Sequence, residues 1–280
     1  MRLTAPIFAL ALLSAAALPA GAQSTRIRQA QDTSDWLDDC RHDDRRWNDD
    51  DSRIRHCEVR RAAVRAGKAL LAIDAGQNGG VSVVGGDVDS VVVVAKITTT
   101  GGSDSEAAEI ARQLRIEVTP TSIRADGPAM GHRTGWWVSF DVTVPRAADV
   151  SVETHNGPIS LEGMNGRVEA HAVNGPLSVY DMAGDVTGRT QNGPITAELR
   201  GKSWNGRGLD LQTQNGPVTL RIADGYNAHL ETGTVNGPMR IDFPVTVQGR
   251  ITKRIALDLG SGGPTVRAVT TNGPVTVRRM

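Results

Sequence analysis

The stretch THNGPISL, Thr154 to Leu161, decides the fold because its central triplet is repeated. Asn-Gly-Pro occurs six times in the second half of the chain. The first three copies are 18 residues apart, and the later intervals are 23, 21 and 36 residues, so insertions interrupt the repeat. Such recurrence indicates a repeated structural unit rather than an isolated turn. The predicted turn residues are Asn156, Gly157, Asn174, Gly175, Asn192, Gly193, Asn215, Gly216, Asn236, Gly237, Asn272 and Gly273.

Apolar and polar residues alternate on both sides of each triplet, which is the period of a β-strand. A polar column lies four residues after each Asn: Ser160, Ser178, Thr196, Thr219, Arg240 and Thr276. The other aligned columns are Val150, Val168, Val186, Leu209, Leu230 and Val266 six residues before the Asn; Thr154, Ala172, Thr190, Thr213, Thr234 and Thr270 two before; Ile159, Leu177, Ile195, Val218, Met239 and Val275 three after; and Leu161, Val179, Ala197, Leu220, Ile241 and Val277 five after.

Two architectures place Asn-Gly between strands: an antiparallel hairpin with a type I′ turn, and a corner of a parallel solenoid. In the hairpin, His155 and Pro158 would exchange two backbone hydrogen bonds, but Pro158 has no N–H to donate. The same defect would recur in every copy. We therefore predict an all-β chain that forms a single-stranded parallel β-helix, with the triplet as a corner. The usual hand of parallel crossovers favours a right-handed coil.

An 18-residue coil accommodates two strands of about six residues each. The second corner is then Met164-Asn165-Gly166 in one coil and Met182-Ala183-Gly184 in the next. Coils about 4.8 Å apart would stack equivalent apolar side chains, and would also stack the Thr column and the corner Asn amides, the latter as a hydrogen-bonded ladder. We expect Gly to supply unusual dihedral angles at the corner and Pro to stiffen its exit.

The chain before the repeats also reads mainly as strands, at 70–73, 81–84, 91–97, 115–118, 122–125 and 136–144. One short helix is expected near 104–114, capped by Ser103 or Asp104. The glycine-rich stretches 76–80 and 85–86 read as turns, because neither has the residues of a phosphate loop. The expected divisions are a signal peptide (1–22), a charged, disulfide-pinned segment (23–69) and the β-solenoid domain (70–280).

The N-terminus is typical of a secretory signal peptide. Arg2 precedes an apolar run over 7–18, and Ala20-Gly21-Ala22 fits the cleavage rule. The run is short for a membrane-spanning helix, and a buried N-terminal helix is the alternative. We expect an exported protein, periplasmic or at the cell surface or secreted, without a transmembrane anchor after cleavage.

The chain has two cysteines, Cys40 and Cys57, and an oxidising compartment predicts a disulfide between them. A bridge over such a loop is worth roughly 3 kcal/mol. The surrounding segment is rich in Arg and Asp, and His42 and His56 flank the cysteines. A metal site built from these groups is conceivable, but no spacing matches a known ligand pattern. We expect no metal and no cofactor.

The composition argues against several kinds of partner and activity. Lys+Arg and Asp+Glu are balanced at 31 each, which predicts no nucleic-acid partner. Acids that could serve an enzyme are scattered over the repeats, and few aromatic residues could form a sugar platform. We therefore expect no enzyme. These acids are Glu153, Glu162, Glu169, Asp181, Asp185 and Glu198, and the aromatic residues are Tyr180, Trp204, Tyr226 and Phe243.

With its signal peptide, its NGGVSVVGG stretch (78–86), its FDVTVP stretch (140–145) and its Asn-Gly-Pro repeats, the chain resembles the bacterial exported family known as putative adhesins. The resemblance covers about residues 70–280, implies an exported parallel β-helix with an adhesive role, and brings no catalytic residues with it.

The function we predict is a non-enzymatic, adhesin-like protein of the envelope or surface that binds a protein or glycan through extended solenoid faces. A polysaccharide-acting β-helix enzyme and a periplasmic accessory of envelope-stress signalling are the alternatives. We expect Arg278 and Arg279 to guard the open end of the last strand against pairing. The candidate binding residues are the Ser/Thr column, Arg240, Arg267, Arg278 and Arg279.

Overall fold

The computed structural model describes residues 33–41, 53–242 and 253–280. The chain divides into two compact units, Met1–Asp43 and Asp44–Met280. The described part of the first unit is a helix over 33–41. The predicted signal peptide, His42 and Phe243 lie outside the described residues. Within the described ranges, no helix is long and apolar enough to cross a membrane.

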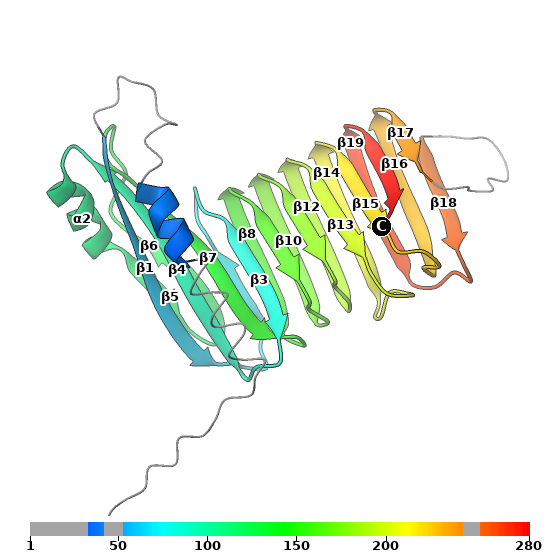
Figure 1. Ribbon diagram of the computed structural model, residues 1–280, viewed down its shortest axis with the longest axis horizontal. Helices are drawn as coiled ribbons and strands as arrows, with labels where there is room; N and C mark the ends of the chain where they lie inside the picture. Colours follow the sequence, from blue (N-terminus) through cyan, green and yellow to red (C-terminus); the bar gives the residue numbers. More distant parts are fainter. Residues whose placement is uncertain (1–32, 42–52, 243–252) are drawn as a thin grey trace, which may run out of the picture. The chain divides into compact units, whose positions relative to one another are not determined.

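The second unit is built from two ten-stranded mixed sheets (Figure 1). Sheet A begins with three antiparallel strands and continues with parallel ones. Its spatial order is β1 (Ile54–Arg65), β4 (Ser90–Gly101), β7 (Gly135–Pro145), β3 (Val81–Gly86), β9 (Ile159–Glu162), β11 (Leu177–Tyr180), β13 (Ile195–Leu199), β15 (Val218–Ile222), β20 (Val275–Arg279) and β17 (Met239–Ile241).

Sheet B has antiparallel pairs at its two ends and parallel pairs between them. The all-β prediction is thus confirmed, whereas closure of the two sheets into a β-helix, and its handedness, stay predictions. The order in sheet B is β18 (Arg254–Leu259), β16 (Ala228–Asn236), β19 (Thr265–Asn272), β14 (Gly208–Asn215), β12 (Asp185–Asn192), β10 (Arg167–Asn174), β8 (Val150–Asn156), β2 (Leu71–Asp74), β6 (Ser122–Asp126) and β5 (Arg115–Val118).

From β8 to β18, consecutive strands alternate between the two sheets, and β19 and β20 again lie one in each sheet. Each Asn-Gly-Pro lies where a strand of sheet B ends and the next strand of sheet A begins, as between β8 and β9. The strands on either side of a triplet are therefore not hairpin partners. Strands one repeat apart pair in parallel instead, with Val150 opposite Val168 and Val168 opposite Val186.

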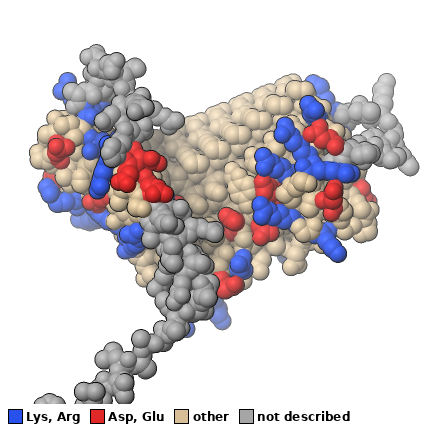
Figure 2. Space-filling model, viewed as in Figure 1, with Lys and Arg blue, Asp and Glu red and all other residues tan. Residues whose placement is uncertain are grey.

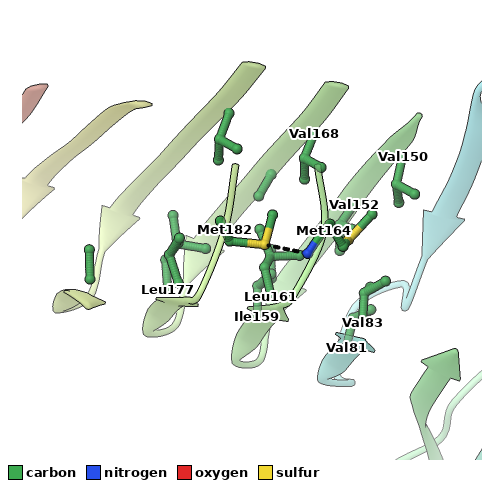
Figure 3. Close-up of a cluster of buried hydrophobic side chains, with 14 of the residues drawn as sticks. Val81, Val83, Val150, Val152, Ile159, Leu161, Met164, Val168, Leu177 and Met182 are labelled. Carbon is green, nitrogen blue, oxygen red and sulfur yellow. Dashed lines mark hydrogen bonds between the residues drawn. The ribbon is translucent and has the colours of Figure 1, made fainter. Parts of the chain in front are cut away.

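The core lies between the two sheets and consists of the aligned apolar columns. Val150 and Val168 of sheet B, and Leu177 of sheet A, are fully buried, and Ile159 is 1% exposed. Figure 3 shows these side chains pointing into the shared interior, together with Met164 from the second predicted corner. Each buried aliphatic side chain contributes about 1.5–3 kcal/mol of hydrophobic stabilisation, so the columns themselves hold the sheets together.

The spatial order of the last repeats differs from their order in the chain. Strand β19, which carries the sixth triplet, pairs with β14 on one side and with β16 on the other, so it separates the fourth copy from the fifth. We expected Arg278 and Arg279 on the last strand, but they belong to β20, which lies between β15 and β17, and β17 ends sheet A. The pairing of β17 with β20 reaches only to Val277, so both arginines lie beyond it.

The charges of the three strands agree with this order. Asp210 of β14 and Glu231 of β16 occupy the same column, and sequential stacking would place the two carboxylates opposite each other, which is unfavourable. The observed order puts Arg267 of β19 between them. Its Nη1 lies 2.6 Å from Asp210 Oδ1, and its Nε lies 3.7 Å from Glu231 Oε2.

The part of the unit before the repeats contains helix α2 (Asp104–Gln113), as expected. Ser103 caps its N-terminus by accepting a hydrogen bond from the Glu106 N–H at 3.2 Å. At the other end, Arg60 of β1 donates to the carbonyls of Ala111 and Leu114, each at 2.6 Å, and so ties the C-terminal end of the helix to β1.

Strand β1 (Ile54–Arg65) precedes residue 70, the predicted start of the β-solenoid domain. Its twelve residues pair along their whole length with β4 and so belong to sheet A. The sequence hid this strand because its arginines break the apolar pattern. Arg55, Arg60, Arg61 and Arg65 place charge on the edge of the sheet, where charge discourages pairing with another chain.

Candidate functional site

The corners of the repeats form a continuous ladder of asparagine side chains. Six hydrogen bonds join seven carboxamides, and the ladder follows the spatial order of the strands. The seventh member is Asn78, from a stretch that the sequence indicated only as a turn. The sequence did contain a sign that Asn78 belongs to the repeat. Val81 and Val83 follow it by three and five residues, the same offsets as in the apolar columns. The Nδ2 donors and Oδ1 acceptors are Asn156 to Asn78 (3.0 Å) and, at 2.8 Å each, Asn174 to Asn156, Asn192 to Asn174, Asn215 to Asn192, Asn272 to Asn215 and Asn236 to Asn272.

Glycine is required at the corner for close approach and not chiefly for its dihedral angles. Of the six triplet glycines, all of which are described, only Gly273 has a φ in the positive range that side chains rarely adopt. We call each ladder Asn, with the Gly and the strand residues next to it, a rung. A Cβ at any of the six glycines would meet the carbonyl oxygen of the glycine on the neighbouring rung. The distances would be 2.1 Å at Gly157 and Gly216, 2.0 Å at Gly175, Gly193 and Gly237, and 2.2 Å at Gly273.

Proline costs no hydrogen bond at this position. Its carbonyl accepts from the first N–H of the neighbouring strand in sheet A, as from Ile159 N to Pro176 O at 2.9 Å. The N–H of the triplet glycine donates to the Asn carbonyl on the next rung, as from Gly157 to Asn174 at 3.0 Å. The backbone of an inner corner is thereby paired on both sides of its Pro.

The Thr column binds the corner from inside. The hydroxyls of Thr154, Thr190, Thr213, Thr234 and Thr270 each donate to a triplet-glycine carbonyl, or to that of Gly79, at 2.6–2.9 Å. We expected these hydroxyls to stack on one another. Instead, each hydroxyl bonds to a backbone carbonyl of the neighbouring strand pair. Ala172 occupies the Thr column but has no hydroxyl. The Gly157 carbonyl therefore receives no hydrogen bond from that column.

Outside, the corner carries no formal charge along nearly its whole length. We define the uncharged strip as the residues from one before to four after each ladder Asn on the seven rungs. Among these described positions, Arg240 is the only Lys, Arg, Asp or Glu, and it lies on the end rung. In Figure 2 uncharged residues occupy the middle of the repeats, while charged ones gather over the C-terminal strands.

Three of the acids that could have served an enzyme form ion pairs with arginines. Glu198 contacts Arg200 and Arg221, each at 3.0 Å, and the hydrogen bond to Glu198 raises the pKa of Arg200. Glu169 pairs with Arg167, and Asp185 lies 3.5 Å from Arg207. In the described residues, no group of three or more His, Cys, Asp or Glu side chains is placed to hold a metal ion.

Two of the aromatic residues considered for sugar stacking are in the core. Trp204 and Tyr226 are each 4% exposed. The indole N–H of Trp204 donates to the Gly184 carbonyl at 3.0 Å, and burial raises the pKa of Tyr226 to about 12. Tyr180 is half-buried on the outer face of sheet A. Neither core residue can therefore stack on a surface sugar.

The structure also has a hollow of about 500 Å³ over the C-terminal strands of sheet B. Its lining includes Gln212, Glu231, Arg267 and Thr271. Arg267 already pairs with Asp210 and Glu231, so its positive charge is not free to bind an anion in this hollow.

The predicted disulfide between Cys40 and Cys57 is confirmed. Cys57 is 6% exposed in β1, so the bridge is anchored in a paired strand. Of the two histidines considered for a metal site, His56 lies within the described residues. Its Nε2 is 3.5 Å from Glu58 Oε2.

No protein-family model and no curated protein matches the chain. Solved structures with some likeness include a putative cell adhesion protein from Clostridium sporogenes ATCC 15579, with 9% identity and a TM-score of 0.45 over 80% of this chain and 100% of that one. A putative adhesin from Bacteroides fragilis NCTC 9343 shows 11% identity and a TM-score of 0.40 over 80% and 97%. A putative lipid binding protein from Parabacteroides distasonis ATCC 8503 shows 10% identity and a TM-score of 0.30 over 80% and 96%. Likeness at these scores establishes neither family nor function.

Proposed function

We propose that this chain is a non-enzymatic, adhesin-like protein, exported to the periplasm or the cell surface, that binds an envelope glycan or protein along its repeats. In this proposal the two sheets are the sides of one right-handed, single-stranded β-helix. The observation that carries the binding proposal is the uncharged strip, which presents the same polar groups on successive rungs about 4.8 Å apart.

A neutral polysaccharide is the partner that the strip fits best. Its outward groups are carboxamides, hydroxyls and proline rings, which offer donors and acceptors without formal charge. Each inner ladder carboxamide uses one N–H and one lone pair along the ladder and keeps others for a ligand. An anionic partner would find only Arg240, on the end rung, as a matching cation among the strip residues, and a lipid or apolar peptide would find no apolar groove there.

The strip lacks exposed aromatic platforms, so the contact on each rung is weak. A long ligand compensates for this, because contacts on several rungs of one rigid surface act together and raise the overall affinity. The regular array therefore favours a polymer over a single sugar.

The test is binding of the purified, signal-cleaved protein to immobilised neutral polysaccharides, measured by biolayer interferometry. Ser178→Lys puts a charged chain in the middle of the strip, and we expect it to weaken binding by about tenfold or more, because a buried cation without a partner is costly. Thr187→Lys is the matched control on the outer face of sheet B, between Glu169 and Asp210, and should bind like the parent.

If the two lysine variants bound polysaccharide equally well, the strip would not be the binding surface. A protein captured from envelope extract, with no polysaccharide bound, would instead favour the accessory role in envelope signalling. Polysaccharide turnover that is lost on replacing a single acid such as Glu198 would favour the enzyme. An uncleaved protein in the cytoplasmic fraction would contradict export.

A further inference from the structure

The six Asn-Gly-Pro triplets are chemically identical tripeptides that occupy different places in the ladder. The last triplet in the sequence, at Asn272, is an inner rung, because Asn272 is hydrogen-bonded to both Asn215 and Asn236. The end rung belongs to Asn236, which is the fifth triplet in the chain. Any difference in reactivity among the six therefore reports their positions in the fold.

Asn-Gly is the dipeptide in which asparagine deamidates most readily, because glycine does not hinder the attack of its own backbone nitrogen. That nitrogen loses its proton and attacks the side-chain carbonyl carbon, Cγ, of the preceding Asn. A bond forms between the backbone N and Cγ, the bond from Cγ to Nδ2 breaks, and ammonia leaves. Water then opens the cyclic imide to aspartate or isoaspartate. The reaction needs a backbone N–H that can lose its proton and move.

Five of the triplets hold that N–H in a hydrogen bond. Their glycine N–H groups each donate to the backbone carbonyl of an Asn on the next rung at 2.9–3.0 Å. The attacking nitrogen must break this bond before it can react, which raises the barrier. The donors and acceptors are Gly157 to Asn174, Gly175 to Asn192, Gly193 to Asn215, Gly216 to Asn272 and Gly273 to Asn236.

The sixth triplet lacks this protection. In the described part of the chain, the Gly237 N–H has no hydrogen-bond acceptor, because the ladder ends at Asn236 and the pairing of β16 with the strand beyond it, β18, stops before the corner, at Gly233. Asn236 is exposed, and its carboxamide is held by a single hydrogen bond, to Asn272. At the opposite end of the ladder Gly79 and Gly80 are buried, which keeps water and base away from Asn78.

We propose that Asn236 is a site of spontaneous deamidation in the folded protein and that the five inner triplets are protected by the ladder. The inference is independent of any binding function.

The product would loosen the end of the ladder. An aspartate or isoaspartate formed from Asn236 has no side-chain N–H to donate to Asn272 Oδ1, and its carboxylate would face that oxygen. The reaction at the end rung therefore removes the last side-chain bond of the ladder and adds a negative charge on the rung that carries Arg240.

The experiment is incubation of the intact, disulfide-bonded protein at mildly alkaline pH, followed by peptide mapping of all six triplets by mass spectrometry. Enzymatic methylation of isoaspartate gives an independent readout. We expect Asn236 to convert at least about tenfold faster than each inner Asn, since the inner sites must first break a backbone hydrogen bond. In concentrated urea with reductant, all six should convert at similar rates, because all six share the reacting Asn-Gly and the Pro that follows it.

Two results would overturn the proposal. One is conversion of Asn272 as fast as Asn236, which would mean that the end of the sequence and not the end of the ladder decides reactivity. The other is a rate at Asn236 as low as at Asn174 in the folded protein while urea releases both. Asn236→Asp provides the reference peptide and should leave the far-UV circular dichroism spectrum unchanged.

Discussion

Replacing Gly175 by alanine tests the physical role of the corner most directly. The new Cβ would lie 2.0 Å from the Gly157 carbonyl oxygen, whereas real Cβ contacts essentially never fall below 3.0 Å. Both groups are backbone, so no side chain can rotate away to relieve the clash. The two rungs must therefore separate locally by about 1 Å from their usual spacing of about 4.8 Å.

Such a separation removes the bonds that join the two rungs at the corner. Those at risk are Gly157 N to Asn174 O (3.0 Å), Ile159 N to Pro176 O (2.9 Å) and Asn174 Nδ2 to Asn156 Oδ1 (2.8 Å). Each is worth about 1 kcal/mol net, and overpacking adds about 1–3 kcal/mol. We expect Gly175→Ala to lower the free energy of unfolding by about 4–6 kcal/mol, or the Tm by about 8–24 °C.

The assay is thermal and urea unfolding followed by far-UV circular dichroism on the disulfide-bonded protein. Gly86→Ala is the matched control, because its Cβ would find no heavy atom nearer than 3.5 Å and its φ lies outside the restricted positive range. We expect that variant to change stability by about 1 kcal/mol or less. If Gly175→Ala were as stable as Gly86→Ala, the close-approach account of the corner would be refuted.

Four further outcomes follow from the same structure. Val168→Asp would bury a carboxylate at a fully buried position and should cost several kcal/mol in a urea melt, whereas Glu169→Lys on the outer face should stay within about 0.5 kcal/mol. Ala172→Thr should raise stability by about 1 kcal/mol by supplying the missing bond to the Gly157 carbonyl, and a lower Tm would contradict this. Arg267→Glu would place three acids in adjacent strands, and faster amide exchange in β16 and β19 than in β10 is expected. Burial raises the pKa of Tyr226 from 10.0 to about 12, so its contribution to stability is complete below pH 10 and is lost as pH rises towards 12; absorbance titration against Tyr226→Phe should show tyrosinate forming late.

Much of this architecture could be predicted from sequence because its interactions repeat. A column such as Val150, Val168 and Val186 appears in the sequence as a period, and in the structure it is a line of neighbours. The missing N–H of Pro158 argued against a hairpin, and parallel pairing agrees with that argument. Local rules also sufficed for the helix near 104–114, since capping by Ser103 depends on residues three apart.

The reason for glycine at the corner could not be derived from one repeat. A turn rule suggested positive φ, but the constraint is the carbonyl of another rung, which is 18 residues away for Gly175 and Gly157. The same holds for Asn78, whose place in the ladder depends on pairing with Asn156 across 78 residues. Contacts between distant segments are absent from local patterns, so only the assembled sheets show them.

The sequence by itself therefore determined the strand period, the composition of the columns and the pairing of the two cysteines, because each depends on local spacing or on the identity of a few residues. Tertiary structure alone decided the order of the last rungs. The apolar residues of β19 match those of β14 and those of β16 equally well. Hydrophobic matching therefore does not decide whether β19 lies between these two strands or after them. The charges of Asp210, Glu231 and Arg267 do discriminate, but their effect exists only once three strands far apart in the chain share one sheet. That order places Asn236, and not Asn272, at the end of the ladder.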